Sequence, residues 1–181
     1  MRKTIALILA VCTLLSFTVA ASADTFTSTT TLTTKVPAAS YTMKIPANQT
    51  IQYGVEYTDI GNVTIENSQG FSTKKNIEVT VGITKFTSES VDTTIPYLLK
   101  TVWSSGQNIS FNISAVLRFE GQQDGTVKSR ATGYLNSTAY EDPLGELERM
   151  EVDVFPSSWD KALAGDYTST ITFTSKVVAA A

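Results

Sequence analysis

The sequence predicts an all-β fold: a single antiparallel two-sheet β-sandwich with one short helix before its last strand. Three observations predict this fold. Apolar and polar residues alternate in short runs along most of the chain, and alternation is the period of a half-buried strand. Turn sequences that contain glycine separate these runs. Only one segment carries the start and stop signals of a helix.

The 181-residue chain begins with an export signal. A basic start precedes an uncharged, mainly apolar stretch over residues 5–19, and Ala21-Ser22-Ala23 fits the small-residue site of a signal peptidase. We therefore expect a signal peptide over residues 1–23, cleaved after Ala23, and a β-sandwich domain over residues 24–181. The apolar stretch of about 15 residues is shorter than the roughly 20 that span a bilayer. The exported protein is thus expected to be secreted or displayed at the cell surface, without insertion into the membrane.

About eight strands are expected in the domain. Residues 25–34 alternate only weakly, with Phe26 and Leu32 as their large apolar side chains. Clearer alternation is found in seven further runs, over residues 41–45, 63–65, 77–81, 95–103, 111–119, 150–154 and 167–177. The last run is the cleanest, since one face carries threonines and Lys176 while the other carries Tyr167, Ile171, Phe173 and Val177.

Two of these runs contain residues that need a separate explanation. Pro96 lacks a backbone donor, so its strand is expected to be an edge strand or to carry a bulge at that point. Glu151 and Asp153 alternate with apolar residues, and we expect this pair to lie on the solvent side of its strand.

Turn sequences separate the strand runs. Residues 104–107 and 123–126 each contain a glycine and are predicted to be hairpin connections, the second with the stronger Asp-Gly sequence. Residues 68–70 and 143–145 are predicted to be further breaks between strands.

Residues 156–165 are the only predicted helix, one or two turns long. A serine is the candidate N-cap, an acidic residue follows in the first turns, and Gly165 is the stop. Trp159 and Leu163 are expected to pack this helix against the domain.

Composition excludes several function classes. The chain has no His, so neither a Ser-His-Asp triad nor a His-ligated metal is possible. Its net charge is -3, and removal of residues 1–23 takes away two cations and no acid, which lowers the charge to -5. An acidic protein is not expected to bind nucleic acid. The one cysteine, Cys12, lies in the signal peptide, so the exported domain has no disulfide.

No catalytic residue, metal ligand or cofactor is assigned. Glu151 and Asp153 share a strand face, as a glycosidase pair would, but a solvated face explains them more simply. Four aspartates near predicted loops suit Ca²⁺: Asp124, Asp142, Asp160 and Asp166. The chain has no D-x-D-x-D-G sequence, however, and turn or cap preference explains Asp124 and Asp160.

Four aromatic residues are candidates for sugar binding. Trp103 and Trp159 fit core positions of the pattern, so core packing is their default role. Tyr134 and Tyr140 fall near loops and are the candidate ligand-binding residues.

The sequence Ala164-Gly165-x-Tyr167, followed by a threonine-rich final strand, resembles the end of bacterial immunoglobulin-like surface and fimbrial-type β-sandwich modules. The resemblance implies an immunoglobulin-like fold in which the tyrosine hydroxyl bonds to nearby backbone. It also implies structural roles for Ala164, Gly165 and Tyr167, together with Trp159. The chain departs from the true immunoglobulin pattern, since it has no cysteine pair and Leu163 replaces an aspartate.

Three functions are consistent with these features. The first is a secreted or cell-surface, non-enzymatic structural or adhesion module of a bacterium, with a protein, cell-envelope or glycan partner. The second is a pilus or filament subunit that self-assembles by strand donation, with residues 25–36 as the donated arm. The third is a carbohydrate-binding module or small glycanase.

Overall fold

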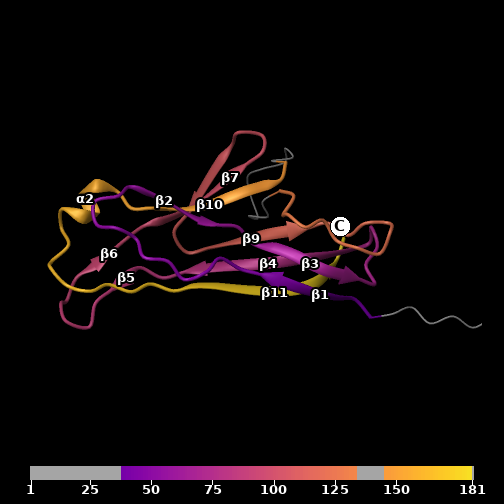
Figure 1. Cartoon of the computed structure of the whole chain (residues 1–181), viewed down its shortest axis with the longest axis horizontal. Coiled ribbons are helices and arrows are strands. Elements are labelled where there is room, and N and C mark those ends of the chain that lie inside the picture. Colours follow the sequence, from indigo (N-terminus) through magenta and orange to yellow (C-terminus); the bar gives the residue numbers. More distant parts are fainter. Residues whose placement is uncertain (1–37, 134–144, 181) are drawn as a thin grey trace, which may run out of the picture. The chain divides into compact units, whose positions relative to one another are not determined.

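The computed structural model describes residues 38–133 and 145–180 (Figure 1). The chain divides into two units, Met1–Lys35 and Val36–Ala181, and every described residue belongs to the second. The described part contains eleven strands and one helix: β1 (Ser40–Lys44), β2 (Tyr57–Gly61), β3 (Thr64–Gln69), β4 (Lys75–Ile83), β5 (Phe86–Thr87), β6 (Thr94–Ile95), β7 (Leu98–Trp103), β8 (Asn108–Phe111), β9 (Ser114–Phe119), β10 (Leu147–Asp153), α2 (Pro156–Trp159) and β11 (Ile171–Ala179). The expected signal peptide and its cleavage site lie outside the described residues, as does the arm over residues 25–36.

The strands of the described part form four antiparallel sheets. The two larger sheets have the orders β2-β10-β7-β8 and β11-β4-β9, and the pairs β1-β3 and β5-β6 form the other two. The prediction of an all-β, antiparallel fold is confirmed. The strands are more numerous and are distributed over more sheets than the simple two-sheet expectation.

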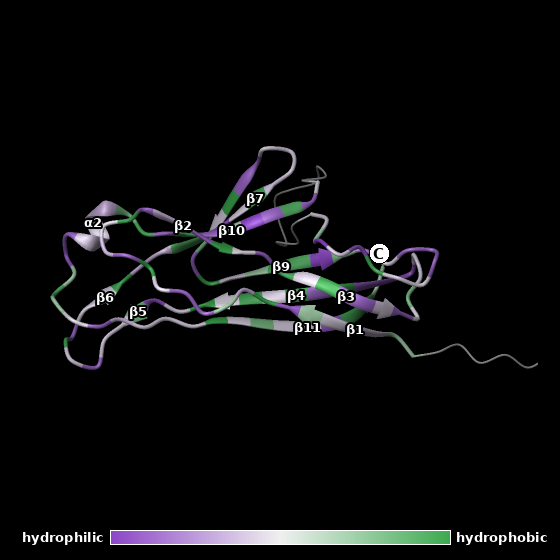
Figure 2. Ribbon diagram, in the orientation of Figure 1, coloured by the Kyte–Doolittle hydropathy of each residue, from purple (hydrophilic) through white to green (hydrophobic). Residues whose placement is uncertain are grey.

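The core forms where the predicted alternation directs apolar side chains inward. In β4, Ile77, Val79 and Val81 are buried, and the facing residues of β9 include Leu117 and Phe119. Figure 2 shows apolar and polar residues alternating along these strands. Each fully buried side chain of this size contributes about 1.5–3 kcal/mol.

Trp103 is a core residue, as its position in the pattern indicates. Its side chain is buried, and its Nε1 donates a hydrogen bond to Thr101 Oγ1 at 3.0 Å. Thr101 Oγ1 in turn donates to the carbonyl oxygen of Ile109 at 3.0 Å. These bonds satisfy the polar atoms of two buried side chains, and Trp103 therefore presents no surface to a ligand.

Two predicted strands are each divided in the structure. The run over residues 111–119 breaks at Asn112-Ile113, where the chain passes from the sheet that contains β7 to the sheet that contains β4. Ile113 is consequently exposed, and its predicted place on the buried face is wrong. The run over residues 95–103 breaks at Pro96, which lies between β6 and β7 and so costs neither ladder a hydrogen bond.

The final strand follows its predicted alternation over its first half. Ile171 and Phe173 are half-buried between exposed threonines. Ser175 is also half-buried, and its Oγ accepts a hydrogen bond from the Tyr41 hydroxyl at 2.8 Å. Val177 is exposed instead of buried, so its predicted place is wrong; Val178, on the other face, is half-buried.

Both predicted hairpin connections are turns. Gly106 and Gly125 adopt φ values of 81° and 89°, which a side chain would disfavour. Asp124 Oδ1 accepts hydrogen bonds from the backbone N–H and the hydroxyl of Thr126. Asp124 is thus explained by the turn.

The single described helix is shorter than predicted. α2 spans one turn, and its N-cap position is occupied by Phe155 without a side-chain cap, so the predicted serine cap is wrong. A cap is less needed here because Pro156, at the start of the helix, has no N–H to satisfy. Leu163 is exposed instead of packed, whereas Trp159 is buried as predicted. No helix in the described ranges is long and apolar enough to cross a membrane.

Candidate functional site

Residues 49–53 and residues 162–169 border a cavity of about 760 Å³ beside α2. A second cavity of about 420 Å³ lies between residues 45–51 and the start of β11. Gln49, Ile51, Phe86 and Ser169 line both cavities, which are therefore neighbours. We refer to the two adjoining cavities as the groove, to the first as its aromatic half and to the second as its apolar half.

An aromatic pair forms one wall of the aromatic half. The ring of Tyr53 meets the ring of Trp159 edge-on, with 5.5 Å between centroids. A hydrogen bond fixes the orientation of the Trp159 side chain, because its Nε1 donates to the carbonyl oxygen of Val55 at 3.1 Å. Tyr53 itself is 77% exposed. The wall thus consists of the Trp159 indole, fixed by its hydrogen bond, and the solvent-exposed ring of Tyr53 in contact with it.

The lining of the aromatic half also contains the Ala164-Gly165-x-Tyr167 sequence. The Tyr167 hydroxyl donates to the carbonyl oxygen of Leu163 at 2.9 Å and also hydrogen-bonds the Thr93 hydroxyl. A Cβ on Gly165 would approach Ser90 Oγ to 3.1 Å, so the glycine permits close packing on the 88–91 loop. Hydrogen bonds in both directions between Thr168 and Thr87 continue this attachment. Together these contacts fix the loop that lines the groove.

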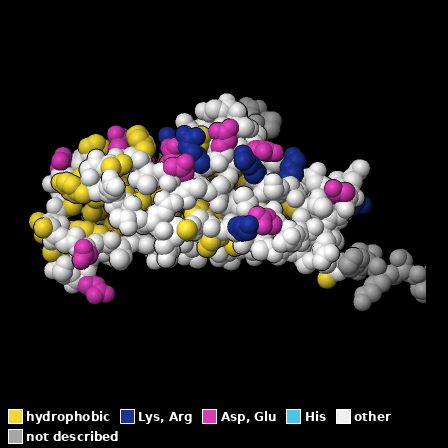
Figure 3. All heavy atoms as spheres, viewed as in Figure 1, with side chains coloured by type: hydrophobic (Ala, Val, Ile, Leu, Met, Phe, Trp, Pro, Cys, Tyr) yellow, Lys and Arg dark blue, Asp and Glu magenta, His cyan; other side chains and the backbone are white. Residues whose placement is uncertain are grey.

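The apolar half of the groove lies along an edge strand. β11 pairs with β4 at one side of its sheet, and Ile171 and Phe173 project toward the cavity lining. The lining also includes Ile45, Ile60, Tyr97 and Val152. Figure 3 shows hydrophobic side chains gathered at the end of the visible face that bears α2. The exposed hydrophobic residues of this end are Tyr53, Val55, Phe155 and Leu163.

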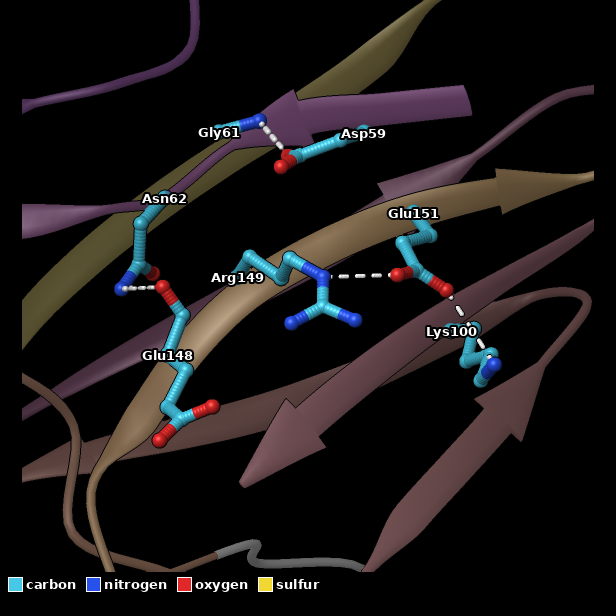
Figure 4. Close-up of polar contacts among 7 residues, drawn as sticks. All are labelled: Asp59, Gly61, Asn62, Lys100, Glu148, Arg149 and Glu151. Atoms are coloured by element: carbon cyan, nitrogen blue, oxygen red, sulfur yellow. Dashed lines mark hydrogen bonds and ion pairs between the residues drawn. The ribbon is translucent and has the colours of Figure 1, made fainter. Parts of the chain in front are cut away.

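A separate cluster of charges lies on the face of the β2-β10-β7 strands that bears Glu151 (Figure 4). Glu151 accepts a hydrogen bond from Arg149 Nε at 2.7 Å and pairs with Lys100 Nζ at 3.1 Å. The Lys100 ammonium also lies 4.8 Å from the centre of the Tyr57 ring. These contacts bring side chains from three adjacent strands together.

The expected solvent position of Glu151 and Asp153 is wrong. Glu151 is 8% exposed and Asp153 is 6% exposed. β10 lies between β2 and β7, so side chains from both neighbours, such as Tyr57 and Lys100, flank the two carboxylates. Asp59 belongs to the same face, where it accepts a hydrogen bond from the Gly61 N–H at 2.7 Å.

The two buried carboxylates differ in their electrostatics. Burial raises the pKa of Glu151, but hydrogen bonds and charges from Arg149 and Lys100 outweigh burial and leave that pKa below its usual value. Burial, aided by the Glu56 charge, raises the pKa of Asp153 above its usual value. Asp153 Oδ1 is buried without a hydrogen-bond partner. Since both oxygens of Glu151 are engaged by cations, Glu151 fits a structural ion network better than the role of a catalytic acid or base.

Of the other predicted site residues, the structure describes only some. Tyr134 and Tyr140 lie outside the described residues, as does Asp142. Asp166 lines the groove, and Asp160 donates its backbone N–H to Pro156. In residues 38–133 and 145–180 no group of three or more Asp, Glu, Cys or His side chains is arranged to hold a metal ion.

Sequence reasoning did not identify Tyr53 as a site residue. Tyr53 lies in a turn, in which the Val55 N–H donates to the Gln52 carbonyl oxygen at 3.2 Å and Gly54 has a φ of 78°. Nothing in that segment alone indicates that residues 162–169 line the same cavity. A comparison with known proteins finds no matching family model, no matching curated protein and no matching solved structure.

Proposed function

We propose that this chain is a secreted or cell-surface, non-enzymatic structural or adhesion module of a bacterium, with an immunoglobulin-like β-sandwich architecture. The observation that carries the proposal is the groove, whose aromatic half combines a cavity of about 760 Å³ with the solvent-facing Tyr53. The export signal over residues 1–23 supports the location. The partner is a protein or a cell-envelope component, without nucleic acid.

Two further observations support this proposal. The bond from Tyr167 to the backbone of Leu163 is the kind that a tyrosine corner makes in immunoglobulin-like domains. The ion pairs of Glu151 leave its carboxylate without a free oxygen for proton transfer, which favours a binding role over hydrolysis.

The test is adhesion of the exported protein, produced from the full chain, to isolated bacterial envelopes. Leu163→Ser alters an exposed groove residue (56% exposed), and Ile113→Ser alters a residue of similar type (72% exposed) outside the groove. We expect binding of the wild type, a loss of about tenfold or more for Leu163→Ser, and no change for Ile113→Ser. A protein that binds neither envelopes nor its own copies would contradict the proposal, as would equal loss in the two variants.

A second candidate function is a filament subunit that assembles by strand donation. The apolar half of the groove favours it, because β11 is an edge strand and its Ile171 and Phe173 border that cavity. An edge strand beside an apolar cavity can accept an added strand from another chain.

Deletion of residues 24–36 from the exported protein tests strand donation. If these residues are the donated arm, the deleted protein keeps the wild-type thermal unfolding transition but forms no polymers in size-exclusion chromatography. An unfolded deletion variant would place the arm in its own domain, and a wild-type protein that stays monomeric at all concentrations would also exclude this function.

A further inference from the structure

We propose that the aromatic half of the groove binds a neutral polysaccharide chain, with one sugar ring stacked on Tyr53. This inference rests on the proposed adhesion function and names the chemistry of its partner. Three properties of the site lead to it: its charge, its aromatic wall and its size.

The charge of the lining favours an uncharged, hydroxyl-rich ligand. Among the residues that line the aromatic half, Asp166 is the one Asp or Glu, and none is Lys or Arg. The other polar side chains there include Gln49, Thr50 and Thr168. The Gln49 amide nitrogen donates to the carbonyl oxygen of Ile60, and its amide oxygen can accept a further hydrogen bond. The Asp166 carboxylate and the Gln49 amide can form hydrogen bonds with the hydroxyl groups of a sugar. An anionic polymer would meet no cation in this lining, and a strongly cationic one would find a single carboxylate.

The aromatic wall provides a preformed stacking surface. Tyr53 presents most of its surface to solvent, and the edge-on contact with Trp159 supports it from one side. Trp159 cannot easily turn away, since its indole N–H is bonded to Val55. A supported aromatic ring loses little conformational entropy on binding, and an apolar sugar face can pack against it.

The size of the site fits several sugar rings. A cavity of about 760 Å³ lies in the range of 300–1,000 Å³ that is typical of small-molecule sites. Gln49 lines both halves of the groove, so a hydrogen-bonding side chain continues past the end of the aromatic half. Ser169 also lines both halves, but its hydroxyl donates to the carbonyl oxygen of Thr84 at 2.7 Å. A linear chain can therefore lie along the wall and continue toward the apolar half of the groove.

The experiment is calorimetric titration of the exported protein with cellohexaose, xylohexaose, mannohexaose and chitohexaose. We expect at least one of these to bind, with affinity reduced about tenfold or more by Tyr53→Ala and several-fold by Asp166→Asn. Tyr57→Ala is the matched control, since Tyr57 is also an exposed tyrosine but lines neither half of the groove. It is expected to leave affinity unchanged, and circular dichroism checks that each variant is folded.

Three results would overturn the inference: no binding of any of the four sugars at about 5 mM, binding that Tyr53→Ala leaves intact, or equal losses in the Tyr53 and Tyr57 variants. Its failure is distinguishable from failure of the adhesion function. Envelope binding that depends on Leu163 without sugar binding would retain adhesion and indicate a protein partner. A protein that bound neither sugars nor envelopes would contradict both proposals.

Discussion

Replacing Gly121 with alanine is expected to lower the free energy of unfolding by about 3 kcal/mol or more. A Cβ at this position would lie 2.1 Å from the carbonyl oxygen of Lys75 and 2.2 Å from that of Ser72. Both atoms belong to backbone, and the turn that carries them is closed by a hydrogen bond from the Lys75 N–H to the Ser72 carbonyl. The Ser72 oxygen cannot move without breaking this hydrogen bond, and the Lys75 oxygen cannot move without displacing the first residue of β4.

Gly82→Ala is the matched control for this prediction. Gly82 lies in β4, and a Cβ there would have no neighbouring atom within 4 Å. We expect a change within about 1 kcal/mol, since alanine mainly reduces the freedom of the unfolded chain. Urea unfolding of the two variants measures the difference. Similar stabilities for Gly121→Ala and Gly82→Ala would refute the close approach of the chain at Gly121.

Replacing Glu151 with alanine is expected to lower the free energy of unfolding by about 2–3 kcal/mol at pH 7. The substitution leaves Lys100 and Arg149 without their shared carboxylate. Most of the lost stability comes from Lys100, because its side chain is only 21% exposed and its charge is left unpaired. Arg149 is 43% exposed and can turn to solvent. Glu66→Ala is the control, because its pair with Lys44 is exposed on both sides and contributes at most about 1 kcal/mol. Equal effects of the two substitutions would contradict the assigned role of Glu151.

The effect of Glu151→Ala also depends on pH. The pKa of Glu151 is lower in the folded state than in the unfolded state, so its stabilisation is present above the unfolded value of about 4.3. It is lost as the pH falls through the lower, folded value. The stability difference between wild type and variant should therefore shrink below about pH 4. Asp153 has the opposite effect, because its pKa is higher in the folded state than in the unfolded state. Its contribution to folding stability is therefore largest below the unfolded pKa and decreases as the pH rises through the folded pKa.

Local patterns account for much of the fold. Alternation along residues 77–81 predicts β4, and the Asp-Gly sequence at residues 124–125 predicts a turn that the structure confirms. Each signal lies within a few residues of the feature that it predicts. The division of the run over residues 111–119 has no such local signal, because it depends on two different partner strands, β7 and β4.

Burial of the charged pair and formation of the groove both depend on distant segments. Glu151 and Asp153 look solvent-facing in their own strand, and only the flanking strands β2 and β7 reveal that they are buried. Tyr53 and Trp159 are more than 100 positions apart in the sequence, yet their rings are in contact. The alternation within a strand predicts which residues share one of its faces, but it does not predict which distant segment packs against that face.

The most direct test of the groove as the ligand site is the pair of tryptophan indole N–H signals in the NMR spectrum of the protein that begins at Asp24. The Trp159 indole is bonded to Val55 in the groove wall, and the Trp103 indole is bonded to Thr101 in the core. On addition of soluble fragments released from bacterial envelopes, the Trp159 signal is expected to shift while the Trp103 signal stays in place. If neither signal moves, or if both move together, the groove is not the binding site.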